Sequence, residues 1–183
     1  PADAAIYAEA VELQLKIDTW PAANYEKSVF TCLRWGRAVA AGLEADPGFM
    51  KSLRRIAPIG YRSKVDRSAQ PYVLLLPDDY NPTHGPYPLV VNLHGGFRFA
   101  CSLGTITGSL SRGKDANPGA ITVSPFGRAN GGYLWTAETD VWDVIADVKR
   151  VEGTPARGPF GRALVVRDPS AALPPAPRSP RDR

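Results

Sequence analysis

The chain has 183 residues, of which 44% are hydrophobic and 22% charged, and a formal net charge of +4. This length allows one sizeable core at the usual allowance of about 100 to 200 residues per domain, and no apolar run approaches the roughly 20 residues that a membrane-spanning helix needs. Six arginines and three acidic residues give residues 151–183 a net charge of +3, which leaves +1 for residues 1–150. No basic face of the kind that binds nucleic acid is visible in this nearly neutral part. Nucleic-acid binding through the arginines of residues 151–183 is a weak alternative, because prolines and no aromatic residues stand between them.

Two helices are predicted at the N-terminus. Residues 4–17 carry an apolar stripe with helical spacing, formed by Ile6, Ala10, Leu13 and Ile17. Pro21 ends this helix, and Asn24 is a suitable N-cap for a second one. The apolar face of the second helix consists of Tyr25, Val29, Leu33, Gly36, Val39 and Leu43. We expect a helical hairpin that packs against the following sheet and carries no site of its own.

From residue 59 the pattern changes from helical to extended. Residues 59–65 and 72–76 flank a turn at Asp66, Arg67 and Ser68, which predicts an antiparallel hairpin. A proline-rich loop follows and contains His84. We expect this histidine to be a solvated turn residue, because nothing near it in the sequence positions it for catalysis.

The stretch of residues 87–97 is the most informative part of the chain. Leu89, Val90, Val91 and Leu93 are apolar without alternation, as in a central parallel strand that is covered on both faces. This strand breaks directly into His94, Gly95, Gly96 and Phe97. The two glycines free the backbone, so that N–H groups near Gly96 and Phe97 can point at a ligand as they do in an oxyanion hole.

Residues 101–133 offer fewer signals. Residues 101–114 are rich in Ser, Thr and Gly and predict a loop with one helical turn, in which Ser109 and Ser111 lack the Gly-x-Ser-x-Gly spacing of a nucleophile elbow. A short strand at 120–123 leads into a loop at 127–133, at the predicted carboxyl edge of the sheet, where α/β folds bind ligands. Arg128 and Asn130 are the candidate substrate-binding residues of this loop. Arg128 has two readings: a bidentate contact with a substrate carboxylate, or, as we favour, hydrogen bonds to carbonyls of its own loop.

The strongest helical pattern spans residues 138–150. Val141, Val144, Ile145 and Val148 share one face, and either Thr136 or Thr139 is the predicted N-cap. Residues 151–183 contain seven prolines and one apolar cluster, at 163–166. We expect this tail to be largely disordered, because it cannot bury enough apolar surface to offset its ordering entropy.

The strand that ends in His94, Gly95 and Gly96 resembles the oxyanion-loop strand of α/β-hydrolases, in the lipase, esterase and prolyl-oligopeptidase-like branches. The hairpin at 60–77 and the segment 124–150 resemble the neighbouring elements of that family, so the resemblance covers about residues 60–150. It implies an α/β fold with a doubly wound, mostly parallel sheet, incomplete here and preceded by the helical hairpin. It also implies that His94 shapes the oxyanion loop and is not the general base.

The resemblance stops before the nucleophile. In that family a Gly-x-Ser-x-Gly turn follows the next strand, and an acid and a histidine follow later. The sequence contains no such motif, and its only histidines are His84 and His94, as though it were truncated or out of frame after residue 150. We expect a hydrolase-family protein that resembles serine esterases or peptidases acting on carboxylic esters or peptides and lacks the catalytic nucleophile. The alternative is a non-catalytic scaffold that binds a small ligand or polysaccharide on a hydrolase-like frame.

These patterns predict three regions: a helical segment at 1–55, the first half of a hydrolase domain at 56–150 and the tail at 151–183. Cys32 and Cys101 make no metal-ligand spacing, and neither a metal nor a cofactor is expected. The two cysteines allow one disulfide, but we favour two buried free thiols. A sheet that lacks its later strands exposes an edge, which favours self-association. The resemblance slightly favours a secreted or periplasmic location, although the sequence leaves the compartment open.

Overall fold

The computed structural model describes residues 1–17, 25–52, 56–81, 83–84, 87–95, 101–111, 118–129, 131–151 and 165–167. The helices in these residues are α1 (Ala2–Ile17), α2 (Tyr25–Ala45), α3 (Phe49–Ser52), α4 (Ser102–Ser111) and α5 (Thr136–Val151). The strands are β1 (Ile56–Arg62), β2 (Ala69–Leu75), β3 (Leu89–Asn92), β4 (Ile121–Pro125) and β5 (Val165–Arg167). The protein therefore belongs to the α/β class, as predicted.

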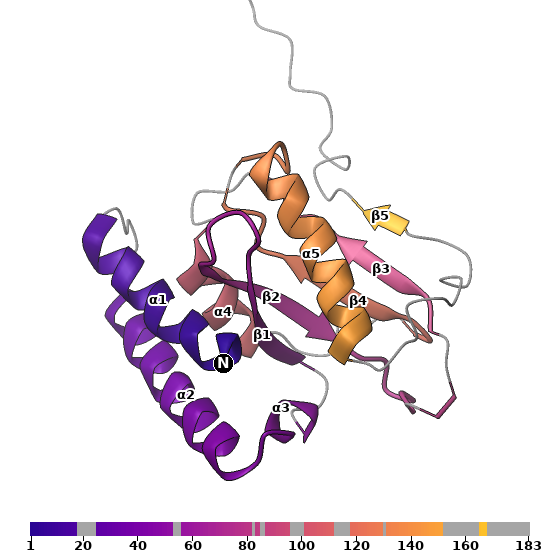
Figure 1. The fold of residues 1–183 in the computed structure, drawn as a ribbon, viewed down its shortest axis with the longest axis horizontal. Coiled ribbons are helices and arrows are strands. Elements are labelled where there is room, and N and C mark those ends of the chain that lie inside the picture. Colours follow the sequence, from indigo (N-terminus) through magenta and orange to yellow (C-terminus); the bar gives the residue numbers. More distant parts are fainter. Residues whose placement is uncertain are drawn as a thin grey trace, which may run out of the picture.

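The described strands form one mixed sheet in the order β1-β2-β4-β3-β5 (Figure 1). The predicted hairpin is confirmed, because β1 pairs antiparallel with β2 from Ile56↔Leu75 to Arg62↔Ala69. β2 is also antiparallel to β4, whereas β3 is parallel to both β4 and β5. The expected parallel pairing thus holds for β3, β4 and β5. The sheet is nevertheless mixed and not mostly parallel, because the β1-β2 and β2-β4 pairs are antiparallel.

Helices cover the two faces of this sheet separately, and each face has its own apolar cluster. α5 lies across one face (Figure 1), where Val144, Ile145 and Val148 are buried, as the sequence pattern predicted. Their partners on the strands are Ile59, Tyr61, Tyr72, Leu74, Leu89, Val91, Ile121 and Val123. On the other face α1, α2 and α4 pack together above β1 and β2. α1 and α4 thus cover β1 and β2 on this face. Leu89, Val90 and Val91 of β3 are all buried, in agreement with its apolar run.

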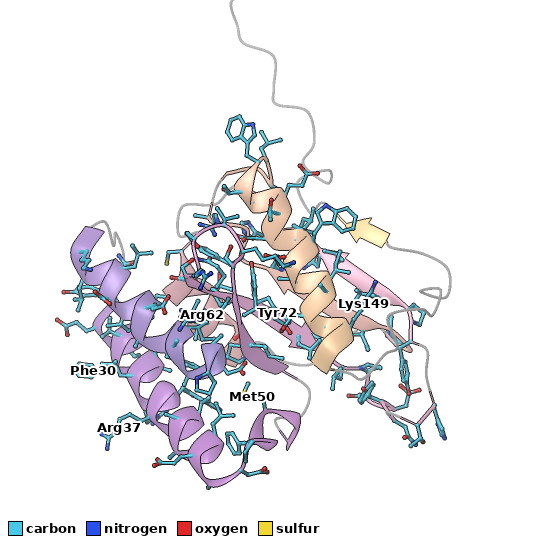
Figure 2. The ribbon with its side chains drawn as sticks, viewed as in Figure 1. Phe30, Arg37, Met50, Arg62, Tyr72 and Lys149 are labelled. Carbon is cyan, nitrogen blue, oxygen red and sulfur yellow. The ribbon has the colours of Figure 1, made fainter. Side chains whose placement is uncertain are left out.

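The predicted helical hairpin is formed by α1 and α2, and Ile6, Ala10 and Val39 of its predicted stripes are buried. Other members of the stripes are not. Leu13 of α1 is 47% exposed and Leu33 of α2 is 41% exposed, so neither belongs to the core. Tyr7 and Cys32 are buried in their place. The reason is a close approach of the two helices at Gly36, where a Cβ atom would lie 2.7 Å from the Tyr7 Cβ. Figure 2 shows Phe30 and Arg37 on the outer side of α2.

Residues 102–111 form a regular helix, which corrects the predicted loop with one helical turn. Leu103 and Ile106 are fully buried against α1 and α2, and this burial stabilises a helix that the local sequence predicts poorly. Its Thr107 hydroxyl donates to the Leu103 carbonyl at 2.9 Å. Tertiary packing has therefore outweighed a Ser, Thr and Gly composition that favours turns.

The structure also tests the predicted N-cap of α5 and the predicted disorder of residues 151–183. α5 begins at Thr136, and Thr139 lies inside the helix with its hydroxyl donating to the Trp135 carbonyl, so Thr139 is not the N-cap. β5 lies within the range predicted to be disordered and pairs with β3 from Val90↔Val165 to Asn92↔Arg167. Pro21, Asn24 and the remainder of the tail lie outside the described residues. Among the helices described, none has both the length and the apolar character required to cross a membrane.

Candidate functional site

The carboxyl ends of β3 and β4 meet at one edge of the sheet because the two strands are parallel and adjacent. The chain leaves β3 toward α4 on one face and leaves β4 toward α5 on the other face. Such a divergence marks the carboxyl edge at which open α/β sheets usually bind ligands. His94 and Gly95 follow β3, so the sequence-predicted segment begins at this edge.

His94 ties the loop after β3 to the loop after β4. Its backbone N–H donates to the Tyr133 hydroxyl at 3.0 Å, and this hydroxyl donates to the Pro125 carbonyl at 3.2 Å. The imidazole Nδ1 lies 2.9 Å from the Gly95 carbonyl oxygen, and Nε2 lies 2.9 Å from that of Phe126. A neutral imidazole carries one N–H and donates to one of these two carbonyls. The ring faces backbone acceptors, which is the geometry of a residue that positions two loops.

The loop after β4 has an unusual backbone. Positive φ angles occur at the non-glycine residues Arg128, Ala129, Tyr133 and Trp135, as well as at Gly127. At Gly127 a Cβ atom would lie 2.3 Å from the Tyr133 ring, so glycine is required there for space as well as for conformation. Left-handed non-glycine residues cost roughly 1 kcal/mol or more each and persist only where their surroundings hold them. Residues of this kind cluster at functional sites, which makes this loop the second part of the candidate site.

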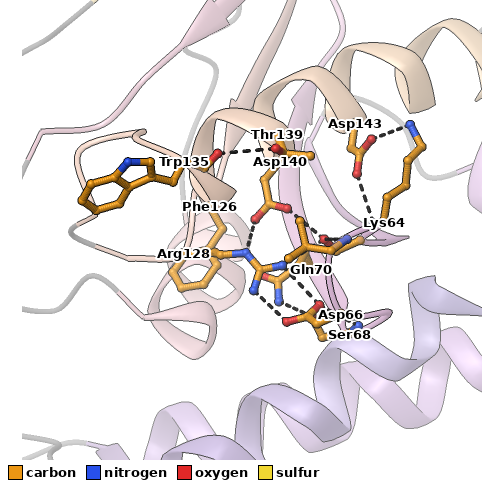
Figure 3. A network of polar contacts seen from close by, with 12 residues as sticks. Lys64, Asp66, Ser68, Gln70, Phe126, Arg128, Trp135, Thr139, Asp140 and Asp143 are labelled. Atoms are coloured by element: carbon orange, nitrogen blue, oxygen red, sulfur yellow. Dashed lines mark hydrogen bonds and ion pairs between the residues drawn. The ribbon is translucent and has the colours of Figure 1, made fainter.

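Arg128 is the main residue that holds this loop, through bonds to three side chains (Figure 3). Its Nε donates to Asp140 Oδ2 at 2.7 Å, and its Nη1 donates to Asp66 Oδ2 at 2.7 Å. Its Nη2 donates to Ser63 Oγ at 2.9 Å and to Asp66 Oδ1 at 3.2 Å. The Ser63 hydroxyl in turn donates to Asp140 Oδ1 at 3.0 Å. Arg128 therefore joins the β1-β2 turn to the start of α5.

This network changes the acid-base properties of its members. Hydrogen bonds from the Arg128 guanidinium, and then from Ser68, hold the pKa of the Asp66 carboxyl well below its usual range. The same bonds to Asp66 raise the pKa of Arg128 above its ordinary value. Arg128 is thus a permanent cation whose N–H groups donate to two carboxylates and a hydroxyl of the chain. These bonds correct the prediction that Arg128 donates to carbonyls of its own loop. The contact with a substrate carboxylate stays a prediction.

A second ion pair lies beside this network on α5. The Lys64 ammonium contacts Asp143 Oδ1 at 2.6 Å, and the Lys64 backbone N–H donates to Asp143 Oδ2 at 3.2 Å. Asp140 and Asp143 are both buried and lie almost one helical turn apart on the face that meets the hairpin turn. Figure 3 shows Trp135 pointing away from these contacts, and its side chain is 84% exposed.

The structure brings together some of the predicted site residues and leaves others open. His94, Gly95 and Arg128 all lie around the carboxyl edge of β3 and β4, whereas Gly96, Phe97 and Asn130 lie outside the described residues. The sequence analysis did not identify Tyr133. It also did not identify Asp66 and Asp140, the two carboxylates that accept hydrogen bonds from Arg128. The Gly-Gly before Tyr133 signalled a special turn, but no local pattern indicated which acids would face Arg128, since Asp66 lies 62 positions away.

Other nucleophilic and metal-binding side chains contribute little to this edge. Ser109 is buried, and its hydroxyl donates to the Ile106 carbonyl at 2.6 Å within its own helix. His84 is exposed in its loop, as predicted. Cys32 and Cys101 are free thiols, as predicted, although Cys101 is only half-buried. In the part of the chain that the structure describes, no cluster of three or more His, Cys, Asp or Glu side chains is placed to hold a metal ion.

Comparisons with known proteins give one structural neighbour. No protein-family model matches the chain. No curated protein matches it either. A search of solved structures finds the crystal structure of a thermostable esterase, with a TM-score of 0.31 and 19% sequence identity. The matched region covers 52% of this chain and 29% of the esterase chain, so this chain corresponds to less than a third of that protein's length.

Proposed function

We propose that this chain supplies the oxyanion-loop half of an α/β-hydrolase-type serine esterase, which acts on a carboxylic ester. One observation carries the proposal: the segment that begins with His94 and Gly95 connects β3 to α4 at the carboxyl edge of the sheet. In α/β-hydrolases an N–H group of the oxyanion hole comes from the loop between the third strand and the first sheet-covering helix, where lipases and esterases carry a His-Gly-Gly type motif. A peptide is the second substrate class of the same chemistry.

The contacts of His94 support this role. An oxyanion hole works because its donors are fixed before charge develops on the carbonyl oxygen of the substrate. His94 is held through its backbone N–H by Tyr133 and through its ring by the Phe126 carbonyl, so the first residue of the loop is anchored to the neighbouring strand. In the proposal, the backbone N–H groups of Gly96 and Phe97 donate to the oxyanion of the tetrahedral intermediate.

In the proposal, neither Ser109 nor His94, among the residues that the structure describes, serves as the nucleophile or the general base. A serine hydrolase passes the serine proton to a histidine that a carboxylate orients. Ser109 donates to its own helix, and the ring nitrogens of His94 face carbonyls, so neither has the required geometry. The chain then retains only the catalysis that an oxyanion hole and substrate binding supply without a triad, which reaches about 10³-fold over water in serine proteases.

The test is hydrolysis of p-nitrophenyl butyrate by the full chain and by two variants of Gly96. We expect slow, saturable hydrolysis above the buffer rate that a fluorophosphonate serine probe does not inhibit. Gly96→Pro removes a backbone N–H and should lower the rate by about 10²-fold, or to the buffer rate. Gly96→Ala keeps this N–H and is the matched control.

Three outcomes would contradict the proposal. Hydrolysis at the buffer rate in the unmodified chain would refute the oxyanion role and favour the non-catalytic ligand-binding scaffold. Equal rates for Gly96→Pro and Gly96→Ala would show that the N–H group has no part in the reaction. Labelling of one serine by the probe, with loss of activity, would show that a nucleophile is present and overturn the view that the chain lacks one.

A further inference from the structure

Two exposed tryptophans lie on α5, outside the site described above. Trp142 is 59% exposed, and Trp135, at the start of the helix, is more exposed still and points away from the Arg128 contacts (Figure 3). The Trp135 carbonyl accepts the Thr139 N–H at 3.2 Å, so Trp135 caps the first turn of the helix. Seven positions, almost two helical turns, place the two residues roughly 10 Å apart along one side of the helix. Tryptophan is mostly buried in folded proteins, so two exposed indoles on one side of a helix indicate a binding surface.

This side of α5 faces away from the β1-β2 hairpin. Trp142 lies roughly 140° around the helix from Asp147, which contacts β2 through Tyr72. Since the sheet order is β1-β2-β4-β3-β5 and α5 packs on β1 and β4, Trp142 projects toward the end of the sheet that β3 and β5 form. Glu138 is exposed on the same side, three positions after Trp135 and four before Trp142. We call Trp135, Glu138 and Trp142 the tryptophan surface.

The chain leaves β5 next to the tryptophan surface. β5 is parallel to β3, and β3 to β4, so Arg167 ends β5 at the same carboxyl edge at which α5 begins. β5 lies two strand positions from β4, which is roughly 10 Å. The seven residues from Arg167 to Pro174 span up to roughly 23 Å when extended, so the C-terminal residues reach the tryptophan surface.

The sequence beyond this linker repeats proline at every third position. The repeat consists of Pro174, Pro177 and Pro180. A polyproline II helix has three residues per turn and rises about 3.1 Å per residue, so these prolines share one face and lie roughly 9 Å apart. This spacing matches the separation of the two indoles. Proline-rich segments in this conformation dock on surfaces lined by aromatic side chains.

The charges of the two segments are complementary. Arg178 stands between Pro177 and Pro180, as Glu138 stands between the two tryptophans. Among the described residues, no lysine or arginine forms an ion pair with Glu138. An arginine beside an indole also gains a cation–π interaction.

We propose that residues 174–181 of this same chain dock on the tryptophan surface as a polyproline II helix. Pro177 and Pro180 pack against the two indoles, and Arg178 pairs with Glu138. A segment that buries too little surface to fold alone becomes ordered by such docking. The proposal concerns a surface outside the candidate site and does not depend on the proposed function.

The experiment measures the solvent exposure of the tryptophans in the full chain. The chain is labelled with fluorinated tryptophan, and the fluorine relaxation caused by a neutral gadolinium chelate in the solvent is recorded. Trp135→Phe and Trp142→Phe assign the two signals. Pro174→Ser/Pro177→Ser/Pro180→Ser removes the proline repeat and should raise the relaxation of both signals. The matched control, Pro155→Ser/Pro159→Ser/Pro169→Ser, changes three prolines outside the repeat and should raise neither.

Charge reversal tests the proposed register. Glu138→Arg should lower the ratio of docked to free tail by roughly 2- to 5-fold, the contribution of one exposed ion pair. The relaxation of the Trp135 and Trp142 signals should therefore increase. Glu138→Arg/Arg178→Glu restores the pair in the opposite sense and should return both signals to the values of the unmodified chain.

The inference is overturned if the proline-repeat variant leaves both signals unchanged, or if the control variant raises them equally. It is also overturned if Arg178→Glu fails to reverse the effect of Glu138→Arg. Relaxation that changes on tenfold dilution would show that the tail of a second copy occupies the surface, which contradicts docking within one chain. Far-UV circular dichroism of each variant checks that the fold is retained.

Discussion

Replacement of Arg128 by Met tests whether the guanidinium holds the β1-β2 turn against α5. The substitution leaves the Asp140 carboxylate, whose side chain is 1% exposed, with the Ser63 hydroxyl still donating at 3.0 Å. Removing one partner of a buried pair costs about 3–5 kcal/mol, because the other charge stays buried without compensation. The Arg128 side chain is 23% exposed and Ser63 retains its bond, so we expect a loss of about 3 kcal/mol in the free energy of unfolding.

The ion pair between the same guanidinium and Asp66 provides the comparison. Asp66 is 45% exposed, and exposed pairs contribute about 0–1 kcal/mol, so Asp66→Asn should cost 1 kcal/mol or less. In Arg128→Met/Asp140→Asn the buried charge is gone, and the double variant should be more stable than Arg128→Met alone. Urea unfolding followed by far-UV circular dichroism, with an unchanged denaturant slope, measures these three differences and that of Asp140→Asn alone.

The reasoning is refuted if Arg128→Met and Asp66→Asn lose equal stability. It is also refuted if Asp140→Asn adds its full cost to Arg128→Met, because additive losses would mean that the two side chains are not coupled.

Three further predictions follow from single residues. Because the folded pKa of Asp66 is depressed, its ion pair stabilises the fold above the unfolded pKa of about 3.9, and this contribution is lost as the pH falls below it. The difference in Tm between the unmodified chain and Asp66→Asn should therefore shrink from pH 6 to pH 2, and a constant difference would contradict this. Burial raises the pKa of Cys32 to about 12. Ellman's reagent at pH 8 should therefore leave this thiol unmodified until urea unfolds the chain. Modification of Cys32 in the folded protein would count against its burial. Gly127 has a φ of +56°, and an added Cβ would lie 2.3 Å from Tyr133, whereas Gly119 has a φ of +68° and open space around it. In thermal melts Gly127→Ala should therefore lose at least about 1 kcal/mol more stability than Gly119→Ala. Equal losses of stability would exclude a steric contribution at Gly127.

Features set by local sequence patterns were predicted correctly. The hairpin of β1 and β2, the apolar strand β3 and the buried face of α5 each follow from spacing within a few residues. α5 is the clearest case, because Val144, Ile145 and Val148 are all buried as expected.

Features set by distant partners were not predictable. Leu103 and Ile106 form a helix because α1 and α2 cover them, although their neighbours are Ser, Thr and Gly. Leu13 is exposed because α1 contacts α2 at Gly36 through Tyr7, which is buried between the two helices. The partners of Arg128 come from a turn and a helix that the sequence does not connect. The same holds for the candidate site. The position of His94 directly after an apolar strand follows from the local sequence. Its contact with Tyr133 depends on a loop in which four residues other than glycine have positive φ angles.

The Tyr133 hydroxyl is shared between the His94 N–H and the Pro125 carbonyl, which belong to the ends of two neighbouring strands. Beyond the last paired residues of β3 and β4, this phenol joins the two chain segments through a single oxygen atom. The loop after β3 and the loop after β4 therefore share one anchor, which belongs to a side chain and not to the backbone.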